Sequence, residues 1–202
     1  MLDLVILSLG FMIHMWALPY SFKTILFDTI VRLAQAGFGV TILLQLDPGT
    51  LVPSTVGLIT GGGVGLACFF FQVVWNRGIA LRRSDITRSF VASQLLILLF
   101  QVPVEELFYR GVFFTVLAAI WGPFTALLLS AALSTMITVV SSRRTIVWVG
   151  SGLMGVLCGL GFYWSQCIWA PILIHTLNDL GYVSLNEKRN VFEERNRGKR
   201  RP

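Results

Sequence analysis

The chain has 202 residues, of which 55% are hydrophobic and only 13% are charged. A soluble domain of this length carries about 25% charged residues, so the composition excludes an ordinary soluble domain. The net charge of +6 comes without a nucleic-acid-binding motif, and we expect no nucleic-acid partner. The three cysteines, Cys68, Cys158 and Cys167, show no paired spacing, so they suggest neither zinc nor disulfides, and we expect them to be small buried residues.

Apolar stretches of about the length that crosses a bilayer follow one another along the chain. They cover roughly 1–18, 25–46, 54–76, 91–119, 123–140, 145–164 and 166–183. No small-residue cleavage site follows the first stretch, so we expect it to be retained. The sequence therefore predicts an all-α transmembrane bundle of about seven spans. It forms a single domain, 1–183, embedded in the lipid bilayer, and a basic tail, 184–202, follows.

Two stretches have features that bear on packing. The third contains "TGGGVGLACFFF", residues 60–71, whose small side chains predict close contact with a neighbouring helix. The fourth is the longest and carries Pro103 near its start, which predicts a kink or a broken helix there.

The basic residues predict the orientation of the chain. With seven spans, all of the 16 Lys and Arg residues except Arg32 and Arg110 fall in loops or a tail on one side. Cytoplasmic loops are enriched in Lys and Arg. We therefore expect a multi-pass integral membrane protein with its carboxyl terminus in the cytoplasm and its amino terminus on the opposite side.

A few ionisable residues lie inside the predicted spans, where a charge costs about 2.5–3.5 kcal/mol even on insertion scales. They are Asp28, Arg32, Glu105, Glu106, Arg110, Asp179, His14 and His175. Asp28 and Arg32 are four residues apart, and we expect them to neutralise each other. The pair would lie near the cytoplasmic end of its helix, where an Arg side chain reaches the interface.

The segment "VPVEELFYRG", residues 102–111, places three charges within six residues. Glu106 and Arg110 share a helix face, whereas Glu105 lies about 100° round, on the face of Tyr109. We therefore expect Arg110 to neutralise Glu106 and Glu105 to lack a full partner. Such a carboxylate suits a general base acting on water. The spacing equally fits a structural carboxylate pair that joins two helices, and both interpretations stay open.

The seventh stretch contains "APILIHTLNDL", in which His175 and Asp179 share a face with Asn178 beside it. Near Glu105, these side chains are suited to orient a water or to stabilise an oxyanion. A histidine in this setting is otherwise a hydrogen-bonded core residue.

"EELFYRG" followed about 70 residues later by "HTLND" resembles the CPBP (Abi) family, which includes the type II CAAX-processing proteases. The resemblance covers roughly 90–183. It implies a helical membrane fold with a polar pocket among the fourth, fifth and seventh spans. It also implies that Glu105 activates the attacking water, that Glu106 and Arg110 support the site, and that His175 and Asp179 form the third motif. Asp179 stands where Asn is commoner.

The second motif of that family, F-x-x-x-H, is not matched. It aligns with "LLLSAALSTMITVV", where Ser134 takes the Phe position and Thr138 takes the His position. No histidine lies between His14 and His175, and His14 would have to fold in as a substitute. A donor set of Glu105, His175, Asp179 and Thr138 does not favour zinc, and we expect no cofactor.

The missing histidine favours a degenerate member of the family, a pseudo-protease acting as a binding, scaffold or assembly subunit of a membrane complex. The alternative is an active glutamate-dependent intramembrane endopeptidase that hydrolyses peptide bonds near the membrane surface, in CAAX-type or peptide processing. We accordingly expect a membrane-protein partner or a peptide substrate. A transporter or channel is disfavoured because the sequence has no inverted repeat.

Overall fold

A computed structural model describes residues 2–20, 25–75, 88–141 and 145–183. Apart from short connections between the helices, the chain in these ranges is helical, and they contain no β-strand. The helices outside the fourth apolar stretch are α1 (Leu2–Tyr20), α2 (Ile25–Leu46), the short 3₁₀ helix η1 (Pro48–Leu51), α3 (Thr55–Trp75), α7 (Pro123–Ser141), α8 (Thr145–Ser165) and α9 (Trp169–Val183). The predicted all-α class is confirmed, and each helix matches a predicted stretch to within a few residues.

The fourth stretch forms one long helical element with changes of winding along it. It comprises α4 (Arg88–Leu96), the π-helical η3 (Ile97–Gln101), α5 (Val102–Glu106), the π-helical η4 (Leu107–Phe114) and α6 (Thr115–Trp121). The helix continues through Pro103, so the predicted break does not occur. Proline lacks an N–H and crowds the turn before it, and the wider π turn of η3 directly precedes α5.

Four helices contain windows long and apolar enough to cross a membrane: Thr29–Leu46, Thr55–Trp75, Pro123–Val140 and Thr145–Ser165. Large apolar side chains, among them Phe70, Val74 and Phe124, are exposed on the outside of the bundle, which suits contact with lipid. The protein is therefore a multi-pass integral membrane protein. The basic loops and the tail that predict its orientation lie outside the described residues, so the orientation stays a prediction.

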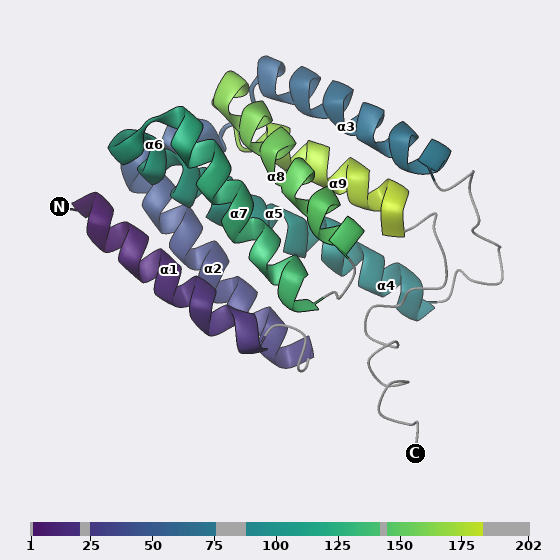
Figure 1. Ribbon diagram of the computed structural model, residues 1–202, viewed down its shortest axis with the longest axis horizontal. Helices are drawn as coiled ribbons and strands as arrows, with labels where there is room; N and C mark the ends of the chain where they lie inside the picture. Colours follow the sequence, from purple (N-terminus) through teal and green to yellow (C-terminus); the bar gives the residue numbers. More distant parts are fainter. Residues whose placement is uncertain (1, 21–24, 76–87, 142–144, 184–202) are drawn as a thin grey trace.

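The helices form one bundle in which α1 and α3 occupy opposite edges and α5 lies in the middle (Figure 1). α3 packs along α9, α9 packs on α8, and α8 packs on α7. On the other side, α2 packs against both α5 and η4. The segment with the charged residues is thus enclosed by helices that come from both halves of the chain.

Glycines allow α3 to approach α9 closely. Gly57, Gly61 and Gly65 recur every fourth residue and are buried. A Cβ atom on Gly61 would lie 2.8 Å from the Cα and the carbonyl oxygen of Ala170. This close approach confirms the packing predicted from the small residues of this stretch.

The residues that follow the glutamates form the apolar core. Phe108, Tyr109, Phe113 and Phe114 are all buried, and they cluster with Phe162 of α8. This aromatic cluster fixes the rotation of η4, and with it the directions in which the charged side chains just before it point.

Candidate functional site

Glu106 and Arg110 form a buried ion pair at the centre of the bundle. Arg110 Nη1 donates to Glu106 Oε1 at 3.2 Å, and the two side chains are 0% and 2% exposed. Arg110 Nη2 also donates to the carbonyl oxygen of Gly155 at 2.9 Å and lies 3.4 Å from Ser134 Oγ. The predicted pairing is confirmed. The guanidinium further ties η4 to α7 and α8, which provides the extra hydrogen bonds that a buried ion pair requires.

His175 of α9 contacts Glu106 rather than Glu105. Its Nδ1 lies 2.6 Å from Glu106 Oε1, and its Nε2 faces Asp179 Oδ2 at 3.6 Å. The side chain of Asn178 donates to Asp179 Oδ1 and accepts from Gln72 of α3. The predicted pairing of His175 with Asp179 is thus extended into a polar chain that runs from Glu106 to α3.

Glu105 is not left without a partner, so that prediction was wrong. Arg32 Nη1 of α2 donates to Glu105 Oε1 at 2.8 Å, and Gln101 Nε2 lies 3.2 Å from the same oxygen. The Arg32 side chain is 4% exposed and the Glu105 side chain 17%. A hydrogen bond from a buried guanidinium stabilises the ionised carboxylate and occupies one of its two oxygens.

The two glutamates have different partners because they point about 100° apart around the helix. α5 contacts α2 on one face and α9 on another. Glu105 therefore meets Arg32, whereas Glu106 meets His175. The sequence predicted the angle between the two carboxylates but not which helix covers each face.

The position of the missing histidine is occupied by a paired hydroxyl. Thr138 Oγ1 lies 2.9 Å from Ser151 Oγ, which joins α7 to α8. Ser134, at the expected Phe position, lies beside Arg110 instead. The helix that would carry the second motif thus contributes the Ser134 hydroxyl to the site, and its Thr138 hydroxyl is paired with α8.

Two predictions involve side chains that the structure does not describe. His14 is one, so its role as a substitute histidine lies outside the described part of the chain. Asp28 is the other, and the Asp28–Arg32 pair stays a prediction while Arg32 binds Glu105.

Sequence reasoning also missed residues that complete the site. Gln101 lies four residues before Glu105, a spacing that predicts contact on a helix and was available from the sequence. Arg32, Gln72, Gly155 and Cys158 reach the site only through tertiary packing. No local pattern in the sequence connects them to the glutamates.

Comparison with known protein families finds a match that covers the part of the chain that carries the site. Residues 87–181 match the family described as type II CAAX prenyl endopeptidase Rce1-like. This range contains all five predicted site residues, and over it the chain is CAAX-protease-like. No curated protein and no solved structure matches the chain.

Proposed function

We propose that this CAAX-protease-like membrane protein is a catalytically silent relative of the type II CAAX endopeptidases that acts as a binding, scaffold or assembly subunit in a membrane complex. The observation that carries the proposal is the contact of Arg32 with Glu105, at 2.8 Å. By resemblance, Glu105 is the residue that would activate water. A general base must accept a proton from that water, and a guanidinium bound to its carboxylate lowers its tendency to do so.

The unmatched second motif supports the same proposal. By resemblance, a histidine at its last position would supply a donor or acceptor nitrogen, but the chain has Thr138 there, whose hydroxyl lies 2.9 Å from that of Ser151. Loss of one member of a catalytic constellation commonly costs several orders of magnitude in rate.

The retained charges have a structural use without catalysis. The Arg32–Glu105 pair joins α2 to α5, and the Glu106–Arg110 pair is linked to α7, α8 and α9. A bundle held together in this way offers a rigid apolar exterior for contact with a partner in the bilayer.

The test compares hosts that lack the gene with hosts that express the wild type, Glu105→Gln or the double variant Arg32→Gln/Glu105→Gln. The double variant removes both charges together, so it controls for the destabilisation that follows when Arg32 loses the Glu105 carboxylate. Membrane-protein abundance and all protein termini are measured by mass spectrometry.

A silent subunit predicts that wild type and double variant restore the abundance of the same partner equally, and that no terminus depends on Glu105. If a longer precursor accumulates in the deletion host and in both variants, but not with wild type, then the protein is an active endopeptidase and the proposal fails.

A further inference from the structure

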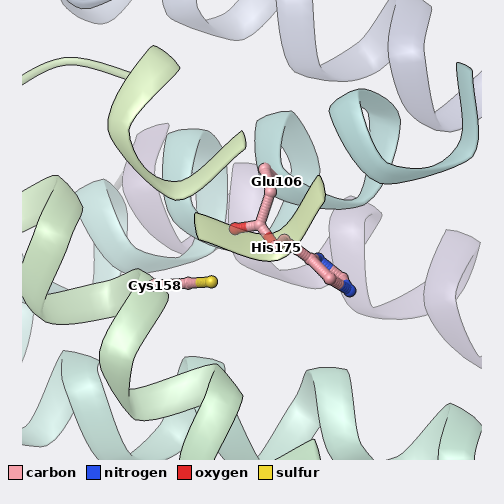
Figure 2. Close-up of side chains that lie close together, drawn as sticks. All are labelled: Glu106, Cys158 and His175. Carbon is pink, nitrogen blue, oxygen red and sulfur yellow. Dashed lines mark hydrogen bonds and ion pairs between the residues drawn. The ribbon is translucent and has the colours of Figure 1, made fainter. Parts of the chain in front are cut away.

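Three side chains that offer different donor atoms meet between α5, α8 and α9. They are the carboxylate of Glu106, the thiol of Cys158 and the imidazole of His175, whose ligand atoms all lie within 4.8 Å of one another. Figure 2 shows the Cys158 sulfur and the Glu106 carboxylate facing each other across a short gap, with the His175 ring on the far side of the carboxylate. Cys158 has no part in the proposed function.

One oxygen of this cluster lacks a partner. Glu106 Oε1 contacts both Arg110 and His175, whereas Glu106 Oε2 is buried and has no hydrogen-bond partner. The whole side chain is 0% exposed. A buried carboxylate oxygen without a partner is costly, and a cation is the kind of group that satisfies it.

The surroundings of His175 suit a metal ligand. Its Nε2 faces Asp179 Oδ2 at 3.6 Å, Asn178 donates to the other oxygen of that carboxylate, and Gln72 in turn donates to Asn178. Metal-binding histidines commonly present their second nitrogen to a carboxylate, which fixes the tautomer and directs the free lone pair at the ion. In this arrangement Nε2 faces Asp179, so Nδ1 is the His175 nitrogen that would bind an ion in the cluster.

We propose that Glu106 Oε2, Cys158 Sγ and His175 Nδ1 bind a thiophilic divalent cation of the Zn²⁺ class. Sulfur, nitrogen and oxygen donors together match the ligands that zinc takes in proteins. A tetrahedral ion holds neighbouring ligand atoms about 3.5 Å apart, so donor atoms that lie within 4.8 Å of one another close by at most about 1.3 Å on binding. On metal binding, His175 Nδ1 leaves Glu106 Oε1 and binds the ion instead. Arg110 keeps its hydrogen bond to Glu106 Oε1.

The charges of the cluster balance when the ion is present. Metal binding deprotonates the thiol, so the thiolate joins the carboxylates of Glu106 and Asp179. Arg110 and a divalent ion together neutralise these three negative charges. Glu106 and Cys158 are both fully buried, so the ion would link α5, α8 and α9 and stabilise the fold. This role is independent of whether the protein hydrolyses anything.

The test uses the full chain, purified in mild detergent with a tag that contains no histidine. Metal content is measured before and after chelation, and the chelated protein is then titrated with Co²⁺. A thiolate ligand gives a sulfur-to-cobalt charge-transfer band in the near ultraviolet. We expect one equivalent of ion per chain and a band that Zn²⁺ removes by displacement.

Matched variants assign the ligands. Cys158→Ser removes the band, whereas Cys167→Ser leaves it, because Cys167 is not part of the cluster. In the structure both thiols contact a backbone carbonyl, Cys158 that of Pro171 and Cys167 that of Val52, so the band reports membership of the cluster. Asp179→Asn keeps the band but weakens Co²⁺ affinity by about 10–100-fold, as expected for a residue that orients a ligand. A wild-type protein that shows no band overturns the proposal by itself, as does a band that survives in Cys158→Ser.

Discussion

Arg32 and Glu105 lie 73 residues apart in the sequence, and their side chains form an ion pair with an N–O distance of 2.8 Å. The pair joins the second helix to the segment that carries the family-like motif. It engages one oxygen of the carboxylate that the resemblance identifies as the base, so the pair bears on both stability and the proposed loss of catalysis.

Removing one partner of this pair should destabilise the bundle. We expect Arg32→Met to lower the free energy of unfolding by about 3 kcal/mol, because the mostly buried Glu105 loses its compensating charge. The double variant Arg32→Met/Glu105→Met should recover most of this loss, since the uncompensated Glu105 carboxylate is removed as well. Unfolding in mixed micelles measures the free energy of unfolding of both the single and the double variant. Equal stability of the single and double variants would contradict the interpretation.

Arg110 should tolerate no conservative replacement. Arg110→Lys keeps the charge, but an ammonium lacks the planar fork that reaches both Glu106 Oε1 and the Gly155 carbonyl. We expect a loss of about 1.5–3 kcal/mol, the usual value of a hydrogen bond to a charged group. Ser134→Ala is the control, because the contact with Ser134 is long, at 3.4 Å, and should cost less than about 1 kcal/mol. The same unfolding assay compares the two.

Alanine substitutions at two nearby glycines of α3 should change the stability differently, because only one of the two glycines packs against α9. Gly61→Ala places a Cβ atom 2.8 Å from the backbone of Ala170, whereas a Cβ atom on Gly63 meets nothing within 4 Å. We expect Gly61→Ala to cost about 1–3 kcal/mol through overpacking. Gly63→Ala should be neutral or stabilising, because alanine is the better helix former. Thermal denaturation in detergent gives the melting temperature of each variant. Equal melting temperatures would contradict the close approach of α3 to α9.

The distribution of basic residues predicts that the carboxyl terminus faces the cytoplasm. A reporter that fluoresces only in the cytoplasm should be active when fused after Pro202 and inactive when fused before Met1. Reversing the charge of Arg143 and Arg144 to Glu should reduce the asymmetry and produce a fraction of inverted molecules. Activity of both fusions in the unmodified chain would mean that the number of spans is even, and activity of the amino-terminal fusion alone would mean that the orientation is inverted.

The local features of this protein could be read from the sequence. The predicted stretches match the helices, because an apolar run of about 20 residues has to satisfy its backbone hydrogen bonds internally as a helix. The Glu106–Arg110 pair was predictable for a similar reason, since residues four apart on one helix are neighbours whatever surrounds them. The resemblance to CAAX proteases rested on the same local spacing.

Only the tertiary structure decided which groups meet across helices. Arg32 was assigned to Asp28 from helical spacing, and Glu105 was left without a partner, because nothing in the sequence states that α2 covers that face of α5. Cys158 likewise looked like a small buried residue until α8 placed it beside Glu106 and His175. Charge and periodicity determine what each helix can offer. The partner of each charge depends on how the helices are rotated against one another, which their packed side chains set.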